Sequence, residues 1–316
     1  MKPRDVVVLG DYEGALAPAL GGLLGERFRV TGYSDAVAEE PVLATRLQDA
    51  AVVVVIRERI PLSSTLIESL PGLELLVTTG RGNTVVPHHG PPLLGTGSLA
   101  SSAAEHTWAL MLSLARDVDG QQSRLRAGLW QDTLGMGLEG RTLGLVGFGR
   151  IGTRVARVAR AFGMRVLAFS RSLDAQRAAS ENVEYAPLGE LMAASDIVSL
   201  HAQLNETSRG LISAELIEAM PPHALLVNTA RAGLVDGAAV ERALSQGRIG
   251  GFAQDVFDEE PLPAEDSLRE QPRAVLTPHI GYATDLNFRV FAEDAAEDIT
   301  EFYRGQIVRG INVPST

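Results

Sequence analysis

The feature that most constrains this chain is the run Gly-Phe-Gly-Arg-Ile-Gly at residues 147–152. It directly follows a short apolar stretch and leads into residues 153–162, which predicts a strand, a glycine turn and a helix in that order. Gly147 permits the tight turn, Gly149 lets a pyrophosphate approach the backbone, and Gly152 lets the helix pack closely on the strand. Because the helix N-terminus then offers free N–H groups to phosphates, the run predicts a dinucleotide site.

Length and composition limit the class of protein. The 316 residues suffice for about two domains with separate cores, and 45% hydrophobic with 21% charged residues is typical of a soluble globular protein. The absence of cysteine excludes disulfides and a cysteine nucleophile, and no residue spacing suggests a metal site. A net charge of −11 without a basic run argues against a nucleic-acid partner. The longest aliphatic run, residues 50–56, is too short to span a bilayer, and no secretory segment is evident, so we expect a cytoplasmic protein.

Short apolar strands alternate with helical stretches, which predicts an α/β fold. In the first hundred residues we expect strands at 6–9, 51–56 and 75–77, and helices at 15–24 and 64–70. The Pro- and Gly-rich segment 85–97 predicts a loop.

From residue 101 the pattern changes to a long helix, 103–116, and a polar, irregular stretch, 117–141. A second α/β series then follows, with helices at 213–220 and 238–245 and strands expected at 142–146, 165–169, 197–200, 225–228, 251–256 and 274–276. Six strands that open with the glycine run predict a complete Rossmann domain. One further helix is expected at 285–303.

The end of the second Rossmann strand discriminates between the two nicotinamide cofactors, because an acidic residue there binds the ribose 2′-hydroxyl of NAD. This chain carries Ser170, Arg171 and Ser172 at that point, and the next acid is Asp174. A guanidinium between two hydroxyls suits a 2′-phosphate. The sequence therefore predicts NADP as the preferred cofactor and leaves NAD open.

Three polar residues each follow a predicted strand of this domain, where open α/β sheets place their ligands: Arg231, Glu260 and His279. A guanidinium can hold a carboxylate in a bidentate fork and polarise a carbonyl. A histidine can exchange a proton near neutral pH, and a neighbouring carboxylate favours its protonated form. Each residue alone would also suit a structural or surface position, but as a set they suit the reduction of a keto acid.

On these residues the chain resembles the NAD(P)-dependent D-isomer-specific 2-hydroxyacid dehydrogenases. The resemblance covers nearly the whole chain, and the matching segments are 104–107, 147–152, 195–201, 227–236, 255–261 and 277–281. It implies two flavodoxin- or Rossmann-like α/β domains with parallel sheets around a deep cleft. Residues 1–100 with 285–316 are then the substrate domain, and residues 101–284 are an NAD(P)-binding domain inserted into it.

The resemblance also implies roles for individual residues. Arg231 is expected to bind substrate, Glu260 to tune the histidine, and His279 to act as the acid/base. The residues expected to contact the substrate carboxylate through their backbone amides are Thr79, Gly80 and Arg81, and the Arg81 side chain either recognises a second anionic group or faces solvent.

The same resemblance gives the cofactor set. Asp255 is expected to face the nicotinamide carboxamide, and His201 to line the cofactor site without reacting. The whole predicted set is Gly147, Gly149, Arg150, Ile151, Gly152, Ser170, Arg171, Ser172, His201, Thr207, Thr229, Ala230 and Asp255. His106 is expected to pack at a helix start.

Departures from the family pattern limit what can be carried over. Ala232 stands where a glycine usually follows the arginine, and segment 84–96 is several residues short and rich in Pro. We therefore expect a reductase of small 2-keto acids such as glyoxylate or hydroxypyruvate, without a defined substrate. Two alternatives stay open: a phosphoglycerate or phosphite dehydrogenase of the same superfamily, and a non-catalytic NAD(P)-sensing binding protein. A homodimer is expected, with helix 103–116 either at its interface or buried within one subunit.

Overall fold

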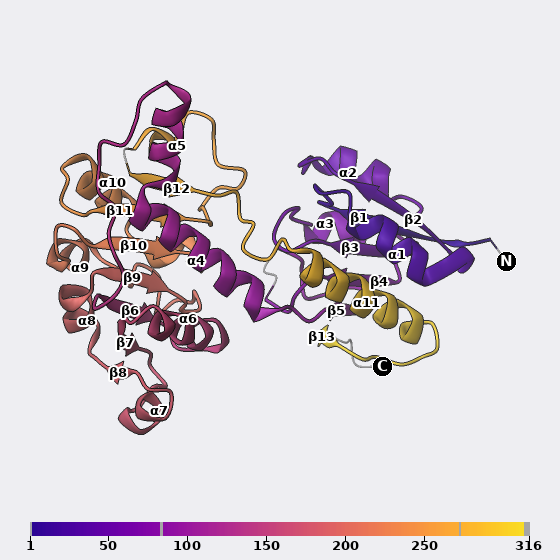
Figure 1. The fold of residues 1–316 in the computed structure, drawn as a ribbon. Helices are drawn as coiled ribbons and strands as arrows, with labels where there is room; N and C mark the ends of the chain where they lie inside the picture. The colour runs from indigo at the N-terminus through magenta and orange to yellow at the C-terminus, as the bar shows by residue number, and fades with distance from the viewer. Residues whose placement is uncertain (1, 83–84, 272, 313–316) are drawn as a thin grey trace. The chain divides into compact units, whose positions relative to one another are not determined.

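The computed structural model of the chain describes residues 2–82, 85–271 and 273–312. The chain forms two compact units, both visible in Figure 1. Unit 1 comprises Met1–Leu99 and Ala283–Thr316, and unit 2 comprises Ala100–Tyr282. Unit 2 is therefore one continuous segment inserted into a unit that is built from both ends of the chain.

Unit 1 contains a six-stranded sheet in the order β13-β5-β4-β3-β1-β2. Five of its strands are parallel: β1 (Arg4–Leu9), β2 (Phe28–Tyr33), β3 (Val52–Val55), β4 (Leu75–Thr78) and β5 (Leu93–Gly95). The sixth, β13 (Gly310–Asn312), pairs antiparallel with β5. The order 2-1-3-4-5 is that of a flavodoxin-like sheet, in which ligands bind where the strand order reverses, here between β1 and β3.

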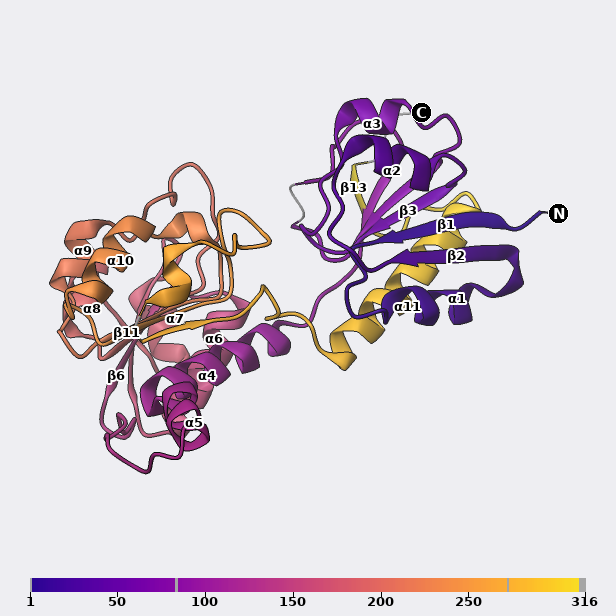
Figure 2. The ribbon, with the colours of Figure 1, turned by 90° about the horizontal axis from the view of Figure 1, so that it is seen from above.

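Helices cover both faces of this sheet. On one face α2 (Glu40–Leu47) and α3 (Ser64–Glu68) bury leucine and isoleucine side chains against alternate residues of β1, β3 and β4. On the other face α1 (Leu16–Leu24) and α11 (Asp285–Phe302) lie side by side, as Figure 2 shows. Coverage on both faces explains why β3 reads Val-Val-Val-Val and is buried throughout. A 3-10 turn, Gly25–Arg27, connects α1 to β2.

Unit 2 contains a seven-stranded sheet in the order β12-β11-β10-β9-β6-β7-β8, all parallel. The strands are β6 (Thr142–Val146), β7 (Arg165–Phe169), β8 (Glu184–Tyr185), β9 (Ile197–Leu200), β10 (Leu225–Asn228), β11 (Gly251–Gln254) and β12 (Ala274–Leu276). Numbered within the unit, this is the Rossmann order 3-2-1-4-5-6 with a seventh strand at the edge. The strand order reverses between β6 and β9, which marks the ligand edge of this sheet.

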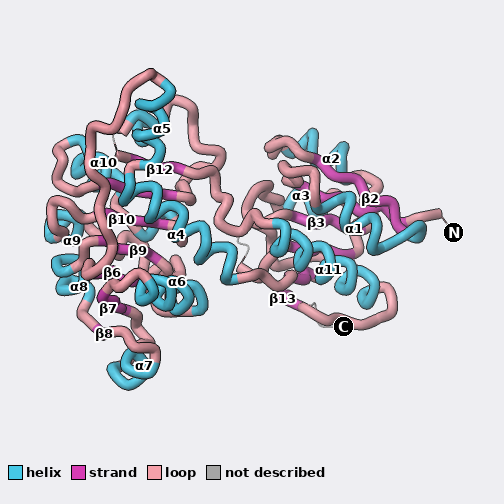
Figure 3. The backbone as a smooth tube through the Cα atoms, in the orientation of Figure 1, coloured by secondary structure: helices cyan, strands magenta, loops and turns pink. Residues whose placement is uncertain are grey.

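Two layers of helices enclose the unit 2 sheet, and Figure 3 distinguishes them from the strands by colour. On one face lie α4 (Ala100–Arg116) and α6 (Arg150–Ala161), and on the other lie α8 (Leu188–Ala194), α9 (Ala214–Ala219) and α10 (Gly237–Ser245). The remaining helices are α5 (Val118–Arg126), α7 (Ala175–Ser180) and the 3-10 turns Ala232–Leu234 and Ser267–Glu270. Trp108, Met111 and Leu114 of α4 are buried in the unit's own core, which agrees with burial of this helix within one subunit, while a dimer interface stays a prediction.

The α/β fold with two doubly wound sheets is confirmed, and most predicted elements lie within a few residues of their expected bounds. Four strands were missed: β2, β5, β8 and β13. β5 falls inside 85–97, so the loop prediction was wrong there, because Leu93 and Leu94 are buried between β4 and β13 despite the preceding prolines. The stretch 117–141 was expected to be irregular, yet it begins with α5, whose exposed polar residues give no apolar periodicity. Among the described residues, no helix has both the length and the apolar character needed to cross a membrane.

Candidate active site

The glycine turn at residues 147–152 joins β6 to α6. Gly147 has φ +100°, and a Cβ there would overlap the backbone of His201 and Ala202. A Cβ on Gly152 would come within 2.5 Å of the Gly147 carbonyl oxygen, so this glycine lets the helix close onto the turn. Gly149 precedes the first turn of α6, and apart from its two chain neighbours no residue that the structure describes comes within 4 Å of the position where its Cβ would be. The open space at Gly149 fits a phosphate group that approaches the backbone at the helix N-terminus.

The segment after β7 carries the residues predicted to choose between NADP and NAD. Ser170 Oγ and Ser172 Oγ lie 3.5 Å apart, and Arg171 Nη1 donates to Thr207 Oγ1 at 2.6 Å. Asp174, the next acid, accepts from the backbone N–H of residue 177 and so caps α7. The loop therefore presents a guanidinium and hydroxyls, while its nearest carboxylate is used to start a helix.

His201 follows β9 and lies over the glycine turn. Its backbone N–H donates to the Val146 carbonyl at 2.7 Å, and its Nε2 lies 3.0 Å from Ser199 Oγ. Burial lowers the pKa of His201 to about 4, so the ring is neutral at pH 7. A neutral, hydrogen-bonded ring at this place agrees with a lining role, because the imidazolium form that would act as an acid is not populated at pH 7.

The segment after β10 carries Arg231. Asn228, the last residue of β10, is buried, and its side chain accepts from the N–H of Ala230 at 3.1 Å and donates to the Arg231 carbonyl at 2.9 Å. The Arg231 side chain donates from Nη1 to the Ala230 carbonyl at 2.7 Å. Thr229 Oγ1 lies 2.8 Å from Thr107 Oγ1 of α4. The buried asparagine therefore fixes the turn from which the guanidinium extends.

His279 and Glu260, which follow β12 and β11, are in direct contact. His279 Nδ1 lies 2.7 Å from Glu260 Oε2, and Glu260 Oε1 accepts from the backbone N–H of Phe257 at 2.8 Å. The imidazole also packs edge-on against Tyr282, with ring centroids 5.6 Å apart. Among the residues that the structure describes, His279 Nε2 has no hydrogen-bond partner. The pair is therefore arranged as a histidine oriented through one nitrogen, with the other available for proton exchange.

These three residues share one edge of the unit 2 sheet. Arg231, Glu260 and His279 follow β10, β11 and β12, which are neighbours in the sheet order. Because the carboxyl ends of parallel strands meet at the same edge, all three residues follow strands at one edge of the sheet, and two of them, His279 and Glu260, are in direct contact.

Asp255, just after β11, is 1% exposed, and its surroundings differ from the expectation. Its Oδ1 accepts from Thr277 Oγ1 at 2.6 Å and from the N–H of Ile280 at 2.9 Å, and its Oδ2 accepts from the N–H of Gly281 at 2.8 Å. Nε2 of His106 on α4 lies 3.2 Å from Oδ1. Burial acts to raise the pKa of Asp255, but the bonds from His106, Thr277 and Ile280 outweigh it and hold this pKa below its usual range. The contact with a nicotinamide carboxamide stays a prediction.

The loop after β4 in unit 1 corrects one expectation. The N–H of Thr79 donates to the Val55 carbonyl at 3.0 Å, and the N–H of Gly80 donates to Thr96 Oγ1 at 2.9 Å, so neither amide is available to a substrate carboxylate. The Arg81 side chain donates from Nη2 to the carbonyl of Gly310 in β13 at 2.9 Å. No local sequence pattern predicts these bonds, because they join segments far apart in the chain.

A second cationic side chain at this loop, Arg57, was not predicted from the sequence. Arg57 follows β3 with φ +51°, and its N–H donates to Thr79 Oγ1 at 3.0 Å. A Cβ on Gly80 would collide with the Arg57 guanidinium, which therefore lies against the loop backbone. Arg57 could have been predicted as a site residue, because it lies directly after a buried parallel strand.

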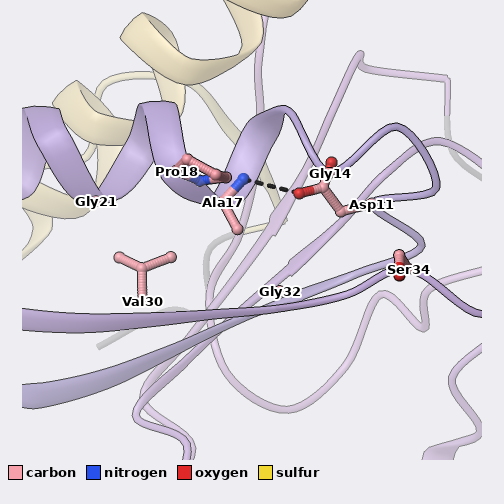
Figure 4. A pocket seen from close by; sticks show the side chains of 8 residues that line it. All are labelled: Asp11, Gly14, Ala17, Pro18, Gly21, Val30, Gly32 and Ser34. Carbon is pink, nitrogen blue, oxygen red and sulfur yellow. Dashed lines mark hydrogen bonds between the residues drawn. The ribbon is translucent and has the colours of Figure 1, made fainter.

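Unit 1 also contains a hollow of about 370 Å³ beside the start of α1 (Figure 4). Its lining residues are Asp11, Gly14, Ala17, Pro18, Gly21, Val30, Gly32 and Ser34. The carboxylate of Asp11 accepts from the backbone N–H groups of Ala15, Leu16 and Ala17 at 2.9 to 3.0 Å, so it serves the N-terminus of α1. The hollow holds none of the predicted site residues.

Comparisons with known proteins agree with this architecture. A sequence model of the D-isomer specific 2-hydroxyacid dehydrogenase, NAD binding domain, matches residues 108–281. The chain is 34% identical over 320 residues to a glyoxylate reductase of Korarchaeum cryptofilum, covering 97% of this chain and 95% of that protein. It is 36% identical over 217 residues to a D-3-phosphoglycerate dehydrogenase of Bacillus subtilis, covering 68% of this chain and 41% of that protein.

Solved structures give the same result. A phosphoglycerate oxidoreductase from Vibrio cholerae is 31% identical, has a TM-score of 0.90 and covers 96% of this chain and 100% of its own. Together with the glycine turn and the residues at the ends of β10, β11 and β12, these matches establish the class of enzyme. The chain belongs to the D-isomer specific 2-hydroxyacid dehydrogenases, as an oxidoreductase of hydroxyacids that uses a nicotinamide dinucleotide.

Proposed function

We propose that this protein reduces small 2-keto acids of the glyoxylate and hydroxypyruvate class to D-2-hydroxy acids, with NADPH as the preferred cofactor. The observation that carries the proposal is the 2.7 Å contact between His279 Nδ1 and Glu260 Oε2, at the same sheet edge as Arg231. The relatives named glyoxylate reductase that cover nearly the whole chain support the substrate class.

The residues at this edge suit each requirement of the reaction. Bound NAD(P)H supplies the hydride for the keto carbon. Arg231 holds the substrate carboxylate and polarises the carbonyl through its guanidinium fork. His279 gives the proton on Nε2 to the oxygen of the reacting carbonyl group, which becomes an alcohol, and the imidazole recovers a proton from solvent. Glu260 stabilises the imidazolium before transfer and, through its bond from the N–H of Phe257, keeps the ring oriented.

The same proposal covers the cofactor-binding residues, the roles of the two units and the oligomeric state. Unit 2 is the NAD(P)-binding domain, and its set includes Arg150, Ile151, Thr207, Thr229 and Ala230 around the glycine turn. Unit 1 is the substrate domain, with Arg81 and Arg57 at its loop. The protein is cytoplasmic and forms a homodimer. The dimer is supported by an apolar surface that α5 and the segment after it expose: Leu125, Leu129, Trp130 and Leu134.

We predict that Arg171→Asp changes cofactor preference. A charge-assisted bond contributes about 1.5–3 kcal/mol, so loss of the guanidinium is expected to raise the KM for NADPH by about 10- to 100-fold. The KM for NADH is expected to stay within about threefold, because the new carboxylate can accept from a ribose 2′-hydroxyl. Steady-state kinetics with both cofactors measures this. Arg157→Asp, an equal charge change at an exposed position of α6, is the control, and equal losses with NADH and NADPH would contradict the prediction.

The activity itself is tested by following NADPH and NADH oxidation with glyoxylate, hydroxypyruvate, pyruvate, phenylpyruvate and 3-phosphohydroxypyruvate. We expect the fastest turnover with the first two and with NADPH. Turnover confined to the phosphorylated acid would favour the phosphoglycerate alternative. Cofactor binding without turnover of any keto acid would favour a sensing protein and overturn the proposal.

A further inference from the structure

His106 of α4 belongs to a polar network with Asp255 and Thr277, next to the loop that carries His279. Its Nε2 lies 2.9 Å from Thr277 Oγ1 and 3.2 Å from Asp255 Oδ1. The ring is 15% exposed, and the carboxylate that it meets is 2% exposed. From the sequence, His106 was expected to pack at a helix start, whereas in the structure it has two polar partners from the far end of the same unit.

The donors in this network can be assigned by counting protons. Thr277 has one hydroxyl proton, and at 2.6 Å that proton goes to Asp255, because an ionised carboxylate accepts and cannot donate. The Thr277 oxygen can then only accept from His106, so Nε2 of His106 carries the proton. His106 is therefore a donor to both Thr277 Oγ1 and Asp255 Oδ1.

The Asp255 carboxylate accepts hydrogen bonds from both sides of the short loop around His279. Asp255 accepts from Thr277 before His279 and from the N–H groups of Ile280 and Gly281 after it. The backbone within the loop is tightly turned, since the N–H of His279 donates to the Thr277 carbonyl at 3.0 Å and His279 has φ +54°. A non-glycine residue in the left-handed region persists when its surroundings hold it there.

We propose that His106, Thr277 and Asp255 form a clamp that positions His279, with His106 acting as a positioning residue for the proton-transferring imidazole. The proposal rests on the proposed function, in which His279 is the acid. The clamp joins α4, which begins unit 2, to the last loop of that unit. Hydrogen bonds to Asp255 from Thr277, Ile280 and Gly281 restrain the backbone of the loop, so the His279 side chain can move mainly by rotation. The contact of its Nδ1 with Glu260 restricts that rotation.

The test uses variants that differ in one donor. His106→Leu removes the N–H at nearly constant volume, whereas His106→Gln keeps an N–H near the position of Nε2. Thr277→Val removes the hydroxyl, and Thr277→Ser keeps it. His223→Leu is the matched control, because His223 also meets a carboxylate of unit 2, Asp196 at 2.7 Å, but lies on the surface.

We expect His106→Leu and Thr277→Val to lower kcat by about 10- to 100-fold through misplacement of the acid. The KM for the keto acid and the Kd for NADPH should stay within about threefold. His106→Gln and Thr277→Ser should recover most of the wild-type kcat. In the unliganded protein, hydrogen exchange at the amides of Ile280 and Gly281 should accelerate in His106→Leu and Thr277→Val, and not in His106→Gln or His223→Leu.

Three results would overturn the clamp: unchanged exchange at Ile280 and Gly281 in both damaging variants, a loss in His106→Gln as large as in His106→Leu, or a loss confined to the Kd for NADPH. Because exchange needs no turnover, it decides the clamp even if the wild-type protein reduces no keto acid. That last result would instead overturn the proposed function, so the two failures are distinguishable.

Discussion

Replacing His279 with Asn is expected to lower kcat by about 10²- to 10⁴-fold, the usual contribution of a general acid. Asparagine is the informative substitute because it is among the few residues that tolerate the left-handed backbone observed here, φ +54°. Its amide can still donate toward Glu260, whose oxygen lies 2.7 Å from His279 Nδ1 in the wild type. The substitution therefore removes proton transfer and spares the loop. Single-turnover reduction of glyoxylate with NADPH measures the chemical step directly.

The control for this variant is His223→Asn, at a half-exposed histidine paired with Asp196. We expect it to keep wild-type kcat. The Kd for NADPH, measured by fluorescence, should be nearly unchanged in both variants. If His279→Asn retained the wild-type rate, the assignment of the acid would be wrong, and a rate lost together with NADPH binding would indicate a cofactor role instead.

Replacing Arg231 is expected to have the second large effect. Arg231→Met should lower kcat/KM for a keto acid by about 10³-fold, because it removes both the carboxylate fork and the charge that stabilises the developing alkoxide. Arg231→Lys keeps the charge without the planar fork, so a smaller loss of about 10- to 100-fold is expected. The turn that carries the side chain should survive, since Asn228 bonds to the backbone of residue 231 and not to its guanidinium.

Arg242→Met, at an exposed position of α10 in the same unit, is the control and should leave kcat/KM unchanged. The Kd for NADPH separates the two possible sites of action. A loss of NADPH affinity equal to the loss of kcat/KM would contradict a substrate role for Arg231. Equal kinetics for Arg231→Lys and the wild type would contradict a bidentate contact between the Arg231 guanidinium and the substrate carboxylate.

Features of this protein that depend on neighbouring residues or neighbouring strands were predictable from the sequence. The glycine turn was predictable because its strand, turn and helix are consecutive, and the family assignment built on it is confirmed. Glu260 and His279 were correctly expected to come together, because both follow neighbouring parallel strands. β3 was evident from four consecutive buried valines, whereas β2 alternates half-buried and exposed residues at the sheet edge and gave no comparable pattern.

The features that could not be predicted depend on contacts between segments that are distant in the sequence. The amides of Thr79 and Gly80 were assigned to substrate, yet Val55 and Thr96 occupy them. The partners of His106, Asp255 and Thr277, are 149 and 171 residues further along the chain, and no local sequence pattern predicts these contacts. β13 is three residues long and is a strand only because β5 lies beside it.

The insertion of one unit into the other also sets an order of events on the ribosome. Unit 2 is contiguous, so it is complete once residue 282 has been synthesised. Unit 1 must wait for α11 to cover its sheet and for β13 to protect the edge of β5. At 5–20 residues per second, the first 99 residues wait about 10–40 s for their missing helix and strand. The nascent N-terminal segment, with one face of its valine-rich sheet covered by α1 alone, is thus the part of this protein most exposed to aggregation and to chaperones, although it is made first.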